Sequence, residues 1–468
     1  MLGLFGSLNL ASRSLSVQQE ATAVAGQNLA NVNNPAYARQ QLNVQTSPDL
    51  QTPVGNEGTG VEAISITEAR DALLDNQIQS EGSVSSSLTS QQTALQDAET
   101  YLNEQLSASS TSNLPSSDNG LTAAISNLFS AFQGVATSPG DAAAQDTLVA
   151  AAQAVTQQFN SISSGLSSVD SNINSSITSD VAGANQDLSD IATLNQQIIV
   201  ATASGTTAND LVDLRQQKLE DLASKVNVDT SMQSNGALNI SIRSVGLVEG
   251  GNVTNQLTTV DPGNGQLLLG SSGGSGTIPV TGGSIGGNIT ARDGALASLQ
   301  SSLDNLAGQL STSVNAVYEP GFSSKGATGQ SFFSGTTAAT ISVNSSLVAN
   351  PATLQYSGDG TAGDNTIALS LAQLANQNIS GLNGQTFSDN YTETVGALGN
   401  AISSVNDQVT NNAAVTSMLQ NQRASVSGVS TDEEMTNLVQ FQKAYQASAE
   451  LITTLNEMLE TVISMKTV

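Results

Sequence analysis

The stretch that decides the fold is Leu4–Val32, with the sequence LFGSLNLASRSLSVQQEATAVAGQNLANV. Its apolar and small side chains recur at alternating steps of four and three residues, the spacing of one face of a coiled-coil helix. The positions on this face are Leu4, Leu8, Ala11, Leu15, Gln18, Thr22, Ala25, Leu29 and Val32. Asn33-Asn34-Pro35 predicts the end of the helix, because proline disfavours a helical residue before it. The chain therefore begins with one long, striped helix.

The other end of the chain repeats this pattern. A helix predicted over Asp432–Met465 carries a similar stripe, with Ser448 as a polar member. The apolar positions of this second stripe are Leu438, Phe441, Tyr445, Ile452, Leu455, Leu459 and Val462. Spacing alone leaves two explanations open: each stripe belongs to the core of one monomer, or it packs between molecules. Since an isolated striped helix has nothing to bury against, we expect the two ends to pair.

Between the two ends, the pattern predicts helices interrupted by β structure. We expect an extended or hairpin-like connector to Ile66, a helix over Thr67–Leu106, a loop at Leu114–Gly120 and a very long helix from Asp141 to about Ala201. The second-helix stripe consists of Ala69, Leu73, Val84, Leu95, Ala98 and Leu102. Val226–Ile289 is rich in glycine and β-branched residues, and the alternation of Leu238, Ile240 and Ile242 predicts a half-buried strand.

The predicted fold class is mainly α with inserted β. It is an elongated multi-helix bundle or coiled-coil rod formed by the N- and C-terminal segments, with a small central β-rich domain. The predicted divisions are an N-terminal assembly helix and connector (1–66), a first rod segment (67–225), a β-rich inserted domain (226–290), a helical return (291–318), an irregular or β insertion (319–363), a last rod segment (364–430) and a C-terminal assembly helix (431–468).

Composition excludes several classes of function. The net charge is −27 with only twelve basic residues, and none lies between Asp71 and Leu214. Binding to nucleic acid or to an anionic membrane needs clustered basic side chains, so neither is expected. The chain has no cysteine and no histidine, which excludes disulfides, the usual zinc sites and a histidine-based triad. No apolar run approaches the ~18 residues of a membrane span, and no cleaved signal peptide is predicted.

Three local patterns could suggest chemistry, but each has a simpler structural explanation. Thr431-Asp432-Glu433-Glu434 resembles a capping box, in which Thr431 caps the last helix and Glu434 reaches back to the Thr431 amide. Asp359–Asp364 lacks the ligand series of a calcium loop, and Asp364 is expected to be a helix N-cap. Gly270–Gly287 lacks the ending of a phosphate-binding loop. No catalytic, cofactor-binding or metal-binding residue is predicted.

Two segments carry a family likeness. Asn28-Leu-Ala-Asn31-Val-Asn33-Asn-Pro35-Ala-Tyr37-Ala-Arg39 resembles the N-terminal signature of bacterial flagellar rod, hook and hook-associated proteins. Ser427-Gly428-Val429-Ser-Thr-Asp432-Glu433-Glu434 resembles the C-terminal signature of the same family. The signature residues are Asn31, Asn33, Pro35, Tyr37, Arg39, Gly428, Asp432, Glu433 and Glu434. Both signatures occur in the right order.

The middle of the chain resembles the members found at the hook–filament junction. The residues that carry this likeness are Leu128–Gln133, Pro139, Ala142, Ala143, Asn209–Leu211, Asp213, Arg215, Leu219, Leu222 and Gly363–Asn365. One departure is Gln145, where the resemblance implies a basic residue. A hook protein or a distal-rod protein is the alternative within the family. A secreted adhesin or hydrolase with a similar helical shell is the alternative outside it.

The resemblance implies a structural, non-enzymatic subunit that connects the flagellar hook to the filament by self-assembly of paired terminal helices. Its implied partners are copies of itself in a ring, the hook protein, the filament-side hook-associated protein and an export chaperone on the C-terminal helix. Its implied location is extracellular, in the flagellum, after export without a cleaved signal. The residues expected to carry self-assembly are Leu4, Leu8, Leu15, Leu29, Val32, Leu438, Phe441, Tyr445, Ile452, Leu455, Leu459 and Val462.

Overall fold

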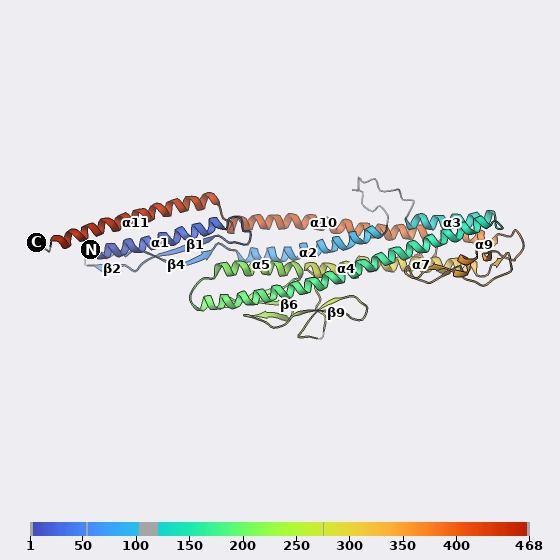
Figure 1. Cartoon of the computed structure of the whole chain (residues 1–468), viewed down its shortest axis with the longest axis horizontal. Coiled ribbons are helices and arrows are strands. Elements are labelled where there is room, and N and C mark those ends of the chain that lie inside the picture. The colour runs from blue at the N-terminus through green and yellow to red at the C-terminus, as the bar shows by residue number, and fades with distance from the viewer. Residues whose placement is uncertain (1–2, 53–54, 103–119, 275, 466–468) are drawn as a thin grey trace.

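The structure is a computed structural model that describes residues 3–52, 55–102, 120–274 and 276–465. It is a long rod, with both ends of the chain at the same tip (Figure 1). The helices are α1 (Leu4–Ala30), α2 (Ala72–Leu102), α3 (Leu121–Thr137), α4 (Ala142–Ala203), α5 (Asn209–Lys225), α6 (Gly283–Ala291), α7 (Ala297–Tyr318), α8 (Ser345–Ala349), α9 (Thr366–Gln373), α10 (Phe387–Ser427) and α11 (Thr431–Met465). A π-helical turn, Arg292–Leu296, joins α6 to α7, and short 3-10 turns lie at Pro351–Thr353, Leu374–Asn376 and Ser380–Leu382.

The strands are short and form antiparallel pairs or small sheets. β1 (Gln40–Thr46) pairs with β4 (Val61–Glu68), and β2 (Leu50–Thr52) pairs with β3 (Gly55–Glu57). A four-stranded sheet has the order β5 (Asp229–Met232), β6 (Leu238–Ile242), β7 (Val245–Glu249) and β8 (Asn252–Val253). The remaining pairs are β9 (Leu257–Val260) with β10 (Leu268–Ser271), β11 (Phe322–Ser323) with β14 (Gln355–Ser357), and β12 (Phe333–Ser334) with β13 (Ser342–Val343). The mainly α fold with inserted β structure is confirmed.

Helix α4 is the main helix of the rod. Its 62 residues span roughly 90 Å, and the Asp141 side chain caps its start by accepting the Ala143 amide. Its inward-facing apolar side chains are buried along the helix, from Val155 to Ile198. Helices α2, α5 and α7 pack against it, and α10 packs against α2 and α7 (Figure 1). One continuous hydrophobic cluster, from Ala94 to Val405, unites these helices with the β layer.

Asparagine side chains of α4 fasten the β layer to the rod. The Asn185 amide group pairs with both the N–H and the carbonyl of Leu257, as a neighbouring strand would. Asn195 does the same with Leu238 and also accepts a hydrogen bond from Arg215. Because these side chains satisfy backbone groups that would otherwise be buried without partners, they fix the position of the strands. The predicted strand at Leu238–Ile242 is confirmed, with alternate residues buried.

The β structure ends earlier than the sequence predicts. Gly283–Ala291 forms helix α6, which packs against α2, whereas we expected β structure through Ile289. A Cβ atom on Gly287 would lie 2.1 Å from the Ser87 carbonyl oxygen, so only glycine permits this close approach. Gly287 is therefore a contact residue of a tightly packed helix pair.

Helix α2 begins later than predicted, at Ala72 rather than Thr67. Strand β4 continues to Glu68 in order to pair with Gln40, and Asp71 accepts the amides of the first helical turn. Of the predicted stripe, Leu95, Ala98 and Leu102 are buried. Leu73 and Val84 are 68% and 42% exposed, so their assignment to the core was wrong, and Leu74 and Ile78 take that role. The predicted loop at 114–120 lies outside the described residues except for Gly120.

Two further local predictions are refined. Asn365, not Asp364, is the N-cap residue of α9, while the Asp364 carboxylate accepts hydrogen bonds from the Thr366 amide and from the Ser357 hydroxyl. Hydrogen bonds to its charged form hold the pKa of Asp364 well below its usual range. The Gln145 amide, where a basic residue was expected, donates to the Pro139 carbonyl at 2.9 Å.

Within the described ranges, no group of acidic residues is arranged to hold a metal ion, and no helix could cross a membrane.

Candidate functional site

The two ends of the chain form one unit beyond the rod body. Helices α1 and α11 lie side by side, and the β1–β4 hairpin follows α1 on its other side (Figure 1). The hydroxyl groups of Ser14 and Ser448 are 3.1 Å apart, and Asn28 contacts Glu434. As the residue number rises along α1 it falls along α11, so the two helices are antiparallel. We call α1, α11 and strands β1–β4 the terminal unit, and the other described helices and strands the rod body.

The predicted assembly stripes face each other only in part. On α1, Leu4, Leu8, Leu15 and Leu29 are half-buried, as is Val32 just beyond the end of the helix. On α11, Leu455 is buried, and Leu438, Phe441, Ile452 and Leu459 are half-buried. Tyr445 and Val462, 38% and 53% exposed, do not join the covered face. Within one chain, the pairing of α1 with α11 therefore leaves much of both stripes open to solvent.

The terminal unit also exposes apolar side chains outside these stripes. Leu451, Met458 and Met465 follow one another at seven-residue spacing on α11 and are 46%, 50% and 76% exposed. Phe5 on α1 is 76% exposed. No buried apolar side chain of the terminal unit belongs to the hydrophobic cluster of the rod body. A surface with this much exposed apolar area is typical of an interaction site.

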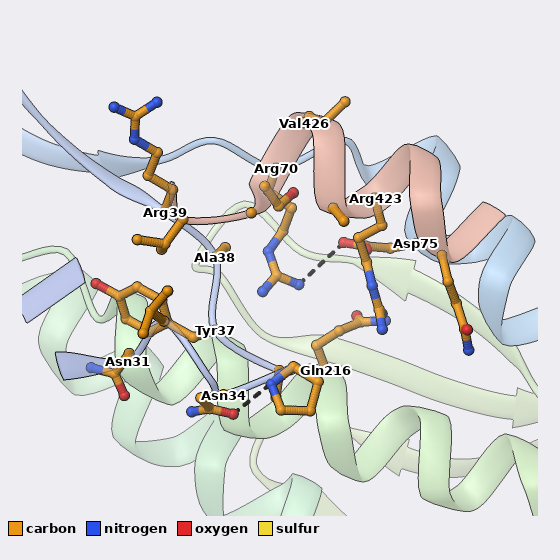
Figure 2. A pocket seen from close by; sticks show the side chains of 18 of the residues that line it. Asn31, Asn34, Tyr37, Ala38, Arg39, Arg70, Asp75, Gln216, Arg423 and Val426 are labelled. Carbon is orange, nitrogen blue, oxygen red and sulfur yellow. Dashed lines mark hydrogen bonds and ion pairs between the residues drawn. The ribbon is translucent and has the colours of Figure 1, made fainter. Parts of the chain in front are cut away.

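The two signature segments meet where the terminal unit joins the rod. They line a cavity of about 880 Å³, together with the ends of α5 and α10. Figure 2 shows the side chains of the Asn31–Arg39 turn on one side and those of Asp75 and Arg423 on the other. The signature residues that line this cavity are Asn31, Asn33, Pro35, Tyr37, Arg39, Gly428 and Glu433. Glu434 is buried next to it, and Asp432 is exposed at the start of α11.

An ion pair joins the two signatures directly. The Arg39 guanidinium lies 2.8 Å from Glu434 Oε1 and 2.9 Å from Glu433 Oε2, and the Arg39 amide donates to the Ser427 carbonyl. Glu434 is only 2% exposed, so its charge depends on this arginine. The predicted capping box was therefore wrong: the Glu434 carboxylate binds the N-terminal signature rather than the Thr431 amide. At the start of α11, it is Ser430 Oγ that accepts a hydrogen bond from a backbone amide, that of Glu433.

We call the region where the terminal unit meets the rod body the joint. Asn28 is its central hydrogen-bonding residue. Its amide nitrogen donates to the Gln40 carbonyl and to Glu434 Oε2, at 2.9 and 3.2 Å. Its oxygen accepts from the Gln40 amide at 2.9 Å and from the Tyr37 hydroxyl at 2.8 Å. Every hydrogen-bonding position of the side chain is thus in use, and the residue is 1% exposed. Asn28 fixes helix, turn and hairpin in one arrangement.

A second arginine fastens the terminal unit to the rod body. Arg70 pairs with Asp213 of α5, with Asp75 of α2 at 3.1 Å and with Glu68 of β4 at 3.3 Å. Asp213 in turn accepts the Ala38 amide at 3.2 Å. Burial, followed by the repulsion of Asp213, raises the pKa of Glu68 to about 7. One guanidinium therefore holds three carboxylates, and Glu68 Oε1 has no hydrogen-bond partner among the described residues.

These contacts connect segments that lie far apart in the sequence. The carboxylates of the joint face arginines or backbone amides. The sequence motifs pointed to the signature residues but not to their mutual contacts, nor to Arg70, Asp75 and Glu68. The spacing of charged residues in the sequence does not indicate ion pairs between residues that lie this far apart along the chain.

Comparisons with known proteins identify chains that are similar to this one. The model of the flagellar hook-associated protein FlgK helical domain matches residues 107–333, and that of the flagellar basal body rod FlgEFG protein C-terminal region matches residues 420–465. Flagellar hook-associated protein 1 of Bacillus subtilis is 28% identical over 518 aligned positions, covering 99% of both chains. Over nearly its whole length the chain is therefore similar to flagellar hook-associated protein 1. This similarity supports a structural function in the bacterial flagellum.

Other relatives match over nearly the same length. Flagellar hook-associated protein 1 of Salmonella typhimurium and that of Escherichia coli are each 24% identical, covering 98% of this chain and 99% of theirs. The solved flagellar hook junction protein FlgK from Burkholderia pseudomallei has a TM-score of 0.62 at 18% identity, covering 75% of this chain and all of that one. At that identity the likeness supports the fold.

Proposed function

We propose that this protein is the junction subunit between the flagellar hook and the filament, and that it self-assembles through its terminal unit. The observation that carries the proposal is the half-covered pair of stripes on α1 and α11, beside further exposed apolar side chains. Association with copies of the same chain would bury this surface, and burial of apolar area is the main favourable term in such association. The rod body then acts as a spacer with its own complete core.

The same reasoning supports the proposed partners. The exposed stripes would contact copies of the chain in a ring, with the hook protein on one side and the filament-side hook-associated protein on the other. An export chaperone would cover the apolar C-terminal helix before secretion. The protein would leave the cell without a cleaved signal and function outside it, in the flagellum, with no catalytic activity and no cofactor.

A deletion strain tests the junction role. Cells that lack the gene should build hooks of normal length but release flagellin monomers into the medium, because nothing joins the two structures. Electron micrographs of the cells and a flagellin immunoblot of the medium would measure both effects, and the restored gene is the control. Normal filaments on the deletion strain would rule out the junction role.

A hook or distal-rod protein remains the second candidate, because the C-terminal model that matches residues 420–465 describes basal body rod proteins. The two roles differ in stoichiometry. A junction ring needs few copies for each flagellum, whereas a hook needs many. Quantitative mass spectrometry of isolated hook–basal bodies would separate them, and a copy number near that of the hook protein would favour the second candidate.

A further inference from the structure

The terminal unit contains a groove that its own chain leaves unfilled. The groove has a volume of about 360 Å³ and lies between α11 and the β1–β4 hairpin, with α1 as its floor. The residues of its apolar part are Val17, Ala21, Val24, Ala25, Leu42, Val44, Val61 and Phe441. Its only charged lining residues are Arg39 and Glu434, which pair with each other at the joint end. The other lining residues are polar and uncharged: Gln18, Asn28, Gln40, Gln41 and Asn437. The groove is therefore suited to an uncharged occupant whose apolar side chain meets its apolar part.

The chain carries an apolar side chain that fits such a groove but cannot reach its own. Phe5, near the tip of α1, is the most exposed aromatic side chain among the described residues, at 76%. It lies sixteen residues before Ala21 on the same straight helix, or about 24 Å along the axis. A rigid helix cannot fold back over that distance. Only a second copy of the chain could bring a Phe5 to this groove.

We propose that Phe5 of one copy docks in the groove of the next. The N-terminal end of α1 in each copy would then contact the groove of its neighbour. The inference rests on the proposed self-assembly and names the contact that carries it. A dry apolar cavity of roughly 150 Å³ is enough to hold a benzene molecule, so the groove can accept a phenyl ring. A projecting side chain and a matching pocket at different places on one chain form a head-to-tail contact, which repeats from copy to copy.

The absence of native cysteine allows a direct test by cross-linking. Asn9 is exposed and lies one helical turn from Phe5 on the same face, while Val44 lies on the groove wall and is 50% exposed. Flagella isolated from cells that produce the full-length Asn9→Cys and Val44→Cys chains together are oxidised and separated by non-reducing electrophoresis. The matched control replaces Val44→Cys with Ile64→Cys, which is 57% exposed on the same hairpin but does not line the groove.

The expected result is a disulfide-linked dimer with Val44→Cys in several-fold greater yield than with Ile64→Cys. Adding Phe5→Ala to the Asn9→Cys chain should lower that yield about tenfold, as loss of an aromatic anchor does. Equal yields with both hairpin positions, or a yield that Phe5→Ala leaves unchanged, would overturn the inference while leaving self-assembly intact.

A charge placed in the groove gives an independent measurement that needs no cross-link. Val44→Glu should prevent incorporation into flagella, whereas Ile64→Glu should be tolerated. Normal incorporation of Val44→Glu would overturn the inference. If the unsubstituted chain formed no assemblies either, the proposed function itself would fail, and this contact with it.

Discussion

At the residue scale, the joint depends on charged side chains that have few other partners. Glu434 is almost completely buried and faces Arg39 and Asn28. Removing one partner of such a pair leaves an uncompensated buried charge, which costs more than the pair itself contributes. The joint has little apolar area to offset that cost, because the hydrophobic cluster of the rod body does not extend to it.

Replacing Arg39 should therefore loosen the terminal unit. We expect Arg39→Met to destabilise the packing of α11 by about 3 kcal/mol, since Glu434 would remain buried without its cation. Hydrogen exchange of the α1 and α11 amides measures this effect without requiring global unfolding. Lys443→Met, an exposed change on the same helix, is the control. The double variant with Glu434→Gln should recover part of the loss, and a purely additive effect would contradict the coupling.

The joint should also respond to pH through Glu68. Burial raises the pKa of Glu68 from 4.5 to about 7, so the folded joint binds a proton more tightly than the unfolded chain does. Its contribution to stability is therefore fully present below pH 4.5 and is lost as the pH rises towards 7. Thermal unfolding of the wild type and of Glu68→Gln across this range would measure it. Parallel pH profiles for the two proteins would show that Glu68 is not the responsible group.

At the element scale, the contact between α6 and α2 requires glycine. A Cβ atom on Gly287 would meet the Ser87 backbone, whereas one on Gly134 in α3 would meet nothing within 4 Å. We expect Gly287→Ala to lower the melting temperature, because two backbones must separate. Gly134→Ala should leave it unchanged or raise stability by about 0.5–1 kcal/mol, through reduced flexibility of the unfolded chain. Similar melting temperatures for both variants would contradict the close packing of α6 on α2.

At the scale of the whole molecule, the rod body and the terminal unit have separate sources of stability. The rod body has one continuous hydrophobic cluster, while the terminal unit buries only a narrow apolar seam and depends on the polar joint. Damage to the terminal stripes should therefore leave the rod folded. This separation suits a subunit whose ends are completed by its neighbours.

A double charge on the covered stripe tests this separation. Leu455→Asp with Leu459→Asp should leave the rod body folded, as far-ultraviolet circular dichroism and proteolysis would show, but should block incorporation into flagella. Thr453→Asp with Thr454→Asp adds the same charge at exposed positions of α11 and serves as the control. If the leucine variant were incorporated normally, the stripe would have no role in assembly.

The sequence by itself determined the local features of this protein. Periodicity predicted α4 and the two striped ends, because helical spacing depends on residues that are close together in the sequence. The turn at Asn33–Pro35 and the strand at Leu238–Ile242 followed from local chemistry in the same way. The resemblance of the two signature segments pointed to the family without any knowledge of how those segments meet.

Only the tertiary structure decided how these pieces fit together. Arg39 and Glu434 are separated by 395 positions, and no spacing rule relates them. Gly287 was expected to lie in β structure, and only the neighbouring helix α2 shows why this position must lack a side chain. Burial also reversed the assignments of Leu73 and Val84. A pattern along the chain records which faces are apolar, but which face meets which partner depends on packing between distant segments.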